Sequence, residues 1–146
     1  MKTEDFLDDL DIEVYELVTS NVAKVKADSI DDELANLPLK YSFYAGAYAL
    51  AQNKLDEAKD KLLTTLSTSK EVVRSNYTGK YKLANTTLDS QVDSFPEVID
   101  ARKDITSMQL KVYLIKGILG ALDIKNQMII QISANRRGEI KTYNSI

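Results

Sequence analysis

The stretch that decides the fold is residues 96–138, PEVIDARKDITSMQLKVYLIKGILGALDIKNQMIIQISANRRG. Its apolar residues recur at alternating spacings of 3 and 4, the repeat of a helix that packs in a coiled coil. This seam consists of Val98, Ala101, Ile105, Met108, Val112, Ile115, Leu119, Leu122, Asn126 and Ile129. Asn126 is expected to be buried in the seam and to fix its register or the number of strands. The helix would span about 43 residues, or about 65 Å at 1.5 Å per residue.

Both ends of this helix carry boundary signals. Ser94 and Glu97 have the spacing of a capping box, and Pro96 falls in the first turn, where no N–H is needed. Gly138 is expected to adopt the left-handed cap conformation, just after Arg136 and Arg137.

A second heptad repeat predicts a long partner helix. Its positions are Tyr41, Tyr44, Tyr48, Ala51, Leu55, Ala58, Leu62, Thr65, Ser69 and Val72. Residues 76–79, Asn-Tyr-Thr-Gly, are typical of a turn, and a short helical piece is expected at Asn85–Val92. The chain is therefore predicted to be all-α, with a long antiparallel coiled-coil hairpin.

The first forty residues predict a shorter helical arm. One helix is expected to begin near Thr3 and to end between Val25 and Ser29, with an apolar stripe that includes Leu7 and Leu17. A further turn is expected at residues 30–35, before a break at Pro38. The predicted division is an N-terminal arm, residues 1–37, and a hairpin and oligomerisation region, residues 38–146, within a single structural domain.

The long C-terminal helix has a second apolar stripe on its opposite face. This stripe consists of Leu110, Leu114, Gly117, Ala121, Ile124 and Met128. One partner helix cannot cover two opposite faces, so the N-terminal helix or another chain must cover the second. A first helix of about 22 residues is too short to follow about 65 Å, which favours a homo-oligomer.

Composition excludes several classes of site. The chain has no cysteine and no histidine, which rules out thiolate metal sites and histidine-dependent nucleophilic catalysis. A carboxylate-only Mg²⁺ site and a glycosidase-type pair of acids stay open. Of these options we expect a non-enzymatic protein without cofactor. No uninterrupted run of eighteen apolar residues is present, and the start, MKTED, is acidic. A cytoplasmic location without membrane contact is expected.

Charge is distributed unevenly along the chain. Residues 1–40 carry eleven acids and four bases, whereas residues 70–146 carry twelve bases and eight acids. The two parts either meet different partners or neutralise each other within one oligomer.

A basic and aromatic segment is the candidate nucleic-acid contact. It consists of Lys70, Arg74, Tyr77, Lys80, Tyr81 and Lys82. Cationic side chains neutralise phosphates and aromatic rings stack on unpaired bases, although a solvated hairpin tip would have the same composition. Arg136, Arg137 and Lys141 form a second basic patch with the same alternative.

The acidic face of the first helix offers a less specific signal. Asp9, Glu13 and Glu16 would share one face, but exposed carboxylates of this kind are usually solvated and not bound to metal. Docking of this amphipathic segment into a partner's groove is the preferred interpretation.

Roughly residues 70–139 resemble small helical phage proteins of the recombination mediator (UvsY-like) family. The resemblance rests on residues 96–102, PEVIDAR, 112–118, VYLIKGI, and 128–139, MIIQISANRRGE, with Gly79-Lys80 ahead of them and Gly120–Asp123 followed by Lys125. The basic motif before the last helix of that family is matched only loosely, through Lys70, Arg74 and Tyr77.

The resemblance implies a non-enzymatic oligomer that binds single-stranded DNA. Such a mediator loads a phage recombinase onto DNA coated with single-strand-binding protein, in the cytoplasm of the infected host. Two alternatives remain. One is a coiled-coil phage scaffold or chaperone-like assembly protein, and the other is a helical inhibitor of a host protein.

Overall fold

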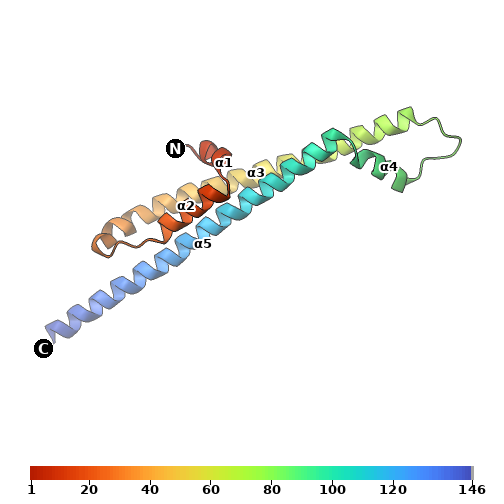
Figure 1. The fold of residues 1–146 in the computed structure, drawn as a ribbon. Coiled ribbons are helices and arrows are strands. Elements are labelled where there is room, and N and C mark those ends of the chain that lie inside the picture. Colours follow the sequence, from red (N-terminus) through yellow and green to blue (C-terminus); the bar gives the residue numbers. More distant parts are fainter. Residues whose placement is uncertain (146) are drawn as a thin grey trace. The chain divides into compact units, whose positions relative to one another are not determined.

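The computed structural model describes residues 1–145, and all regular structure in that range is helical (Figure 1). The elements are α1 (Thr3–Asp9), α2 (Ile12–Ala23), the 3-10 turn η1 (Ala27–Ser29), α3 (Ile30–Asn76), α4 (Asn85–Asp93) and α5 (Pro96–Asn144). The all-α prediction is confirmed, as are the loop after Asn76 and the short helix that follows it.

Contacts divide the chain into two compact units. Unit 1 contains residues 1–50 together with the chain from Lys111 onwards, and unit 2 contains Ala51–Leu110. Helices α3 and α5 each contribute a segment to both units. The predicted arm, residues 1–37, lies entirely within unit 1.

Unit 1 has a core to which α1 contributes directly. The Phe6 ring packs edge-on against Phe43 and Tyr44 of α3, with centroid distances of 5.6 and 5.5 Å. The Lys111 Nζ atom donates a hydrogen bond to the Leu7 carbonyl at 2.6 Å, which satisfies an acceptor left open at the end of α1. Fully buried side chains of α5 complete the core: Ile115, Ile118, Leu122 and Ile129.

The predicted single N-terminal helix is wrong, because the structure has two. The Asp11 side chain accepts a hydrogen bond from the Val14 backbone N–H at 2.8 Å and so caps a new helix, α2. Aspartate favours this position because its carboxylate satisfies a donor that has no helical partner. The chain changes direction between α1 and α2 as a result.

The predicted break at Pro38 is also wrong, since α3 runs continuously through it. Proline lacks the N–H that would bond to the carbonyl of Leu34, four residues earlier. Leu34 and Pro38 are both exposed, so this turn of α3 lies at the surface of the helix and not in the core. The acids Asp31, Asp32 and Glu33 stabilise the first turn, so the helix starts before the proline.

Pro38→Ala is expected to raise the free energy of unfolding by about 1–3 kcal/mol, because it restores one helical hydrogen bond and removes a steric conflict. Urea unfolding followed by circular dichroism measures this. Pro96→Ala is the matched control. Its proline occupies the first helical position, where it costs little. Equal effects of the two substitutions would contradict a continuous α3.

The ends of α5 differ from expectation. The helix begins at Pro96 as predicted, but the Ser94 hydroxyl donates to the Gln91 carbonyl at 2.7 Å and terminates α4, so the predicted capping box is wrong. Gly138 has no positive φ, and α5 continues through it to Asn144. The prediction of a glycine cap there is therefore wrong too.

The seam of α5 also shifts along its length. Asn126 is exposed, and Lys125 occupies the buried position beside it. The residues of α5 that are buried in unit 1 recur at spacings of 3, 4, 3 and 4: Ile115, Ile118, Leu122, Lys125 and Ile129. This line passes through Lys125 and leaves Asn126 outside the core, so the predicted burial of Asn126 is wrong.

Helix α5 is the one helix within residues 1–145 that is long and apolar enough to cross a membrane. That is weak support for a membrane span, because the central helix of a soluble protein meets the same criterion. In unit 1, α5 packs through its buried side chains, and its Lys125 pairs with Glu33 of α3.

Candidate nucleic-acid interface

The predicted basic segment forms the end of unit 2 at which α3 passes into α4. Lys70 and Arg74 lie in the last two turns of α3, and Lys80, Tyr81 and Lys82 lie in the connection that follows. We call residues 70–84 the basic tip. It carries four bases and one acid, for a net charge of +3.

The basic tip is anchored by a small core of its own. Val73, Leu88, Val92 and Val98 are buried together, and Leu83 at the end of the connection packs against them. The Lys70 Nζ atom lies 3.4 Å from a carboxylate oxygen of Asp89 on α4. The connection is therefore fixed at both ends, while its middle faces solvent.

The two tyrosines of the basic tip differ in their surroundings. Tyr81 is 81% exposed and Tyr77 is 41% exposed. The Tyr77 hydroxyl lies over Gly79, where a Cβ atom would be only 2.1 Å away, so any larger residue at 79 would displace the ring. Tyr81 thus offers an open aromatic face between two lysines, a combination suited to stacking on a base while phosphates are neutralised.

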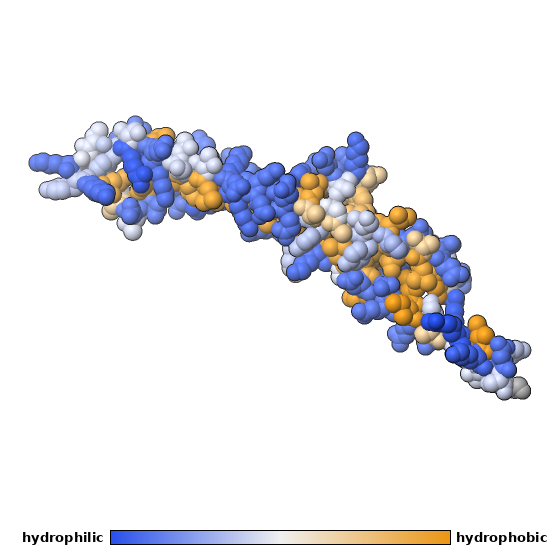
Figure 2. Space-filling model, turned by 180° about the vertical axis from the view of Figure 1, so that it is seen from behind, coloured by the Kyte–Doolittle hydropathy of each residue, from blue (hydrophilic) through white to orange (hydrophobic). Residues whose placement is uncertain are grey.

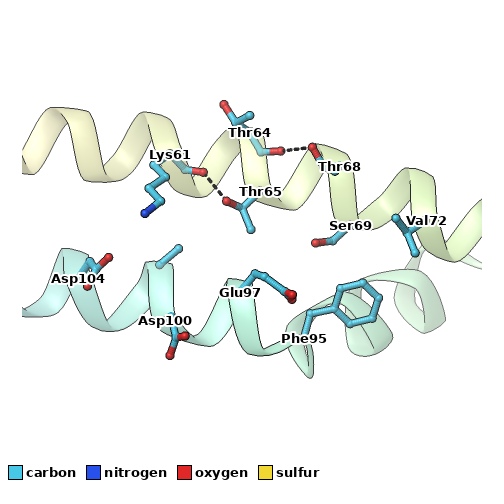
Figure 3. Close-up of a pocket in the computed structure, with 11 residues that line it drawn as sticks. Lys61, Thr64, Thr65, Thr68, Ser69, Val72, Phe95, Glu97, Asp100 and Asp104 are labelled. Carbon is cyan, nitrogen blue, oxygen red and sulfur yellow. Dashed lines mark hydrogen bonds between the residues drawn. The ribbon is translucent and has the colours of Figure 1, made fainter.

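A groove that sequence reasoning missed lies between α3 and α5 in unit 2 (Figure 3). Its volume is about 610 Å³. Lys61 and the hydroxyl side chains of α3 form one wall, and Glu97, Asp100 and Asp104 of α5 form the other. The sequence signal was the small polar pair Thr65 and Ser69 in the predicted seam, because small side chains leave space between helices.

This groove is a poor candidate for binding phosphate or metal. The Thr65 hydroxyl donates to the Lys61 carbonyl at 2.7 Å, and the Thr68 hydroxyl donates to the Thr64 carbonyl at 3.0 Å (Figure 3). The acidic wall would repel an anion. No group of three potential metal ligands occurs among the described residues, the predicted acidic face of Asp9, Glu13 and Glu16 included.

The second predicted basic patch belongs to unit 1. Arg136 and Arg137 line a shallow groove with Asp31 and Ile130, in the C-terminal part of α5. The Arg137 Nε atom donates to the Ser133 carbonyl at 3.3 Å. Because α5 continues beyond Gly138, these arginines lie within the helix and not at its end.

The predicted oligomerisation stripe divides into buried and exposed members. Leu114 is buried in the chain's own core, and Gly117 and Ala121 are half-buried, with the Tyr15 ring of α2 close to Gly117. Leu110, Ile124 and Met128 remain exposed. Figure 2 shows apolar side chains reaching the surface among polar ones on the part of the chain that leads to the C-terminus.

The aromatic cluster of unit 1 serves packing. Burial raises the pKa of the Tyr44 hydroxyl above its ordinary value, because the ionised form is poorly solvated there. Tyr44 contacts Phe6 and Phe43, so it fixes α1 on α3.

No protein family, curated protein or solved structure matches this chain. The resemblance to recombination mediators therefore remains a prediction from the sequence.

Proposed function

We propose that this chain is a non-enzymatic, oligomeric protein that binds single-stranded DNA through the basic tip and acts as a recombination mediator. The observation that carries the proposal is the exposed Tyr81 between Lys80 and Lys82, on a connection anchored at both ends. In this proposal α3 and α5 form an antiparallel coiled-coil hairpin that presents the basic tip at its end. The recombinase and single-strand-binding protein as partners, and the host cytoplasm as location, rest on the resemblance alone.

Oligomerisation compensates for a modest charge on each basic tip. The whole chain is net acidic at −3, and one tip of charge +3 contacts few phosphates. Several tips on one assembly would bind one strand with a much higher effective concentration than separate chains. Binding is expected to weaken steeply with salt, because phosphate contacts release counterions.

The charge of the basic tip is tested with Lys80→Glu/Lys82→Glu. Fluorescence anisotropy of a labelled oligothymidylate, from about 50 to 300 mM salt, is expected to give a log–log slope smaller by roughly 1.4 for this variant, at about 0.7 per lost contact. Lys24→Glu/Lys26→Glu is the matched control. It makes the same charge change at a second Lys-x-Lys sequence, outside the basic tip. If both variants lower the slope equally, binding is not localised to the tip.

The aromatic contact is tested separately with Tyr81→Ala. Loss of one stacked base is expected to cost about 1–3 kcal/mol, which weakens binding roughly 5- to 150-fold with little change in salt slope. Tyr143→Ala, which alters an equally exposed tyrosine (82%) of α5, should leave affinity unchanged. Unaltered binding by Tyr81→Ala would remove the observation on which the proposal rests.

An assembly protein that does not bind DNA is the second candidate. The exposed apolar residues of α5 favour it, because they suit self-association without any nucleic acid. A defined oligomer that ignores the oligonucleotide even at about 50 mM salt would select this candidate over the mediator.

A further inference from the structure

We propose that two copies of this chain pair through one exposed face of α5, antiparallel about a two-fold axis near residue 119. This inference rests on the self-association included in the proposed function, and it names the surface and the geometry. The pairing face consists of Tyr113, Gly117, Gly120 and Ile124, with Lys116 and Asp123 along one edge.

The pairing face is apolar and mostly open within the chain, although the Tyr15 ring of α2 lies close to Gly117. Tyr113 is 74% exposed and Ile124 is 60% exposed, although both lie on the central packing helix of unit 1. Their spacing through the two glycines is 4, 3 and 4 residues, so the four positions share one side of α5. Three of these positions, Gly117, Gly120 and Ile124, also line a shallow open groove between α2 and α5.

Along the pairing face, two glycines lie between two large side chains, and this order suits two helices that cross at the glycines. A Cβ atom added at Gly120 would meet nothing within 4 Å, so a partner backbone has room to approach there. Tyr113 and Ile124 lie on either side of the glycines, about 8 Å from the centre at 1.5 Å per residue. Crossing helices separate away from their closest point, and large side chains at these positions fill the widening gap.

The face is its own complement when one copy is reversed. Around a centre near residue 119, Tyr113 of one copy meets Ile124 of the other, and Gly120 of one copy reaches the level of Gly117 of the other, beside its Tyr15. The face therefore fits a second copy of this chain with no other partner required, as expected for an isologous interface.

The edge charges select the antiparallel direction. Lys116 and Asp123 are both exposed and lie seven residues apart, too far along one helix to pair with each other. In a parallel pair, the edge with Lys116 and Asp123 would face the opposite edge of the partner, so neither residue would meet its own copy or the other. In the antiparallel pair each lysine faces an aspartate, and this happens twice because of the symmetry.

Cysteine cross-linking tests whether the two copies of α5 run antiparallel. Because the chain has no natural cysteine, every disulfide must come from the introduced residues. A mixture of Tyr113→Cys and Ile124→Cys chains is expected to form mixed disulfide dimers under mild oxidation, whereas neither variant alone forms them. Self-cross-linking of Ile124→Cys alone would show parallel pairing and overturn the proposal.

A charge exchange tests the edge. Lys116→Glu or Asp123→Lys alone is expected to weaken the dimer roughly tenfold in sedimentation equilibrium, because both symmetry-related pairs are lost or reversed. Lys116→Glu/Asp123→Lys together is expected to restore the affinity. Failure of the double variant to recover would contradict the cross-pairing.

Gly120→Leu tests the close approach without threatening the fold of the single chain. The site is open in one chain, so the variant should remain folded, but its side chain would block the partner. Gly46→Leu, at an equally open helical glycine of α3, is the matched control and should stay dimeric. A Gly120→Leu protein that still dimerises, or a wild-type protein that is monomeric at about 0.1 mM, would overturn the proposal.

The DNA test above keeps the two proposals separate. If the wild-type chain binds the oligonucleotide as a monomer, the pairing face fails and DNA binding stands. If the mixed cross-link forms but the oligonucleotide does not bind, the pairing face stands and the mediator function fails.

Discussion

Glu33→Ala is expected to lower the free energy of unfolding by about 3–5 kcal/mol, far more than an ordinary change of a charged residue. The reason is its partner, Lys125, whose ammonium group pairs with the Glu33 carboxylate and whose side chain is only 2% exposed. Without the carboxylate, a positive charge would remain buried with no counter-charge. Urea unfolding followed by circular dichroism at 222 nm measures the loss.

Two further variants show whether the loss comes from the unpaired charge. Asp32→Ala removes an exposed acid from the same first turn of α3, and it should cost no more than about 1 kcal/mol through the helix dipole. Glu33→Leu/Lys125→Met replaces both charges with apolar groups and should be close to neutral or stabilising. A loss below about 1 kcal/mol for Glu33→Ala would mean that Lys125 reaches solvent.

The Glu33–Lys125 pair shows a limit of pattern reading. The heptad repeat places Asn126 in the seam, whereas the line of buried residues in unit 1 passes through Lys125, between Leu122 and Ile129. A heptad repeat correctly identifies the residues that face a partner helix over its first turns. Over several heptads, the position of the partner helix decides which neighbours are buried, and that position depends on the whole chain.

Helix existence was easier to predict than helix ends. The two heptad repeats correctly indicated the long helices that became α3 and α5. The break expected at Pro38 and the cap expected at Gly138 were wrong, because local preferences of about 1–3 kcal/mol compete with the packing of a whole helix. The cap at Asp11, which divides the first helix, is a local signal that the apolar stripe running across it conceals.

The sequence predicts which residues make up the basic tip, but it does not predict which of its side chains are exposed. The sequence indicated a loop rich in lysine and tyrosine, and the structure distinguishes Tyr81, open to solvent, from Tyr77, folded over Gly79. The acidic groove beside Thr65 was not predicted, because weak seam residues alone do not show what fills the space between two helices. The exposed apolar position of Tyr113 was not predicted, because Tyr113 belongs to neither of the two apolar stripes of α5.

Leu122→Ala is expected to lower the free energy of unfolding by about 2–5 kcal/mol. Leu122 is 1% exposed and belongs to the fully buried set of α5 in unit 1, with Ile115, Ile118 and Ile129. Truncation removes the transfer free energy of the side chain and leaves a cavity that rigid neighbouring helices cannot close. Leucine and alanine both favour helix, so backbone propensity contributes little to the difference.

Leu39→Ala makes the same chemical change in the same unit, on α3, where the side chain is 71% exposed. Its cost should stay within about 0.5 kcal/mol, because exposed leucine has little burial to lose. The difference between the two variants measures how much the core of unit 1 depends on α5, and chemical denaturation at one protein concentration suffices to obtain it. Similar losses would show that Leu39 is covered in solution, and repeating the measurement at a tenfold lower concentration would reveal whether a second chain covers it.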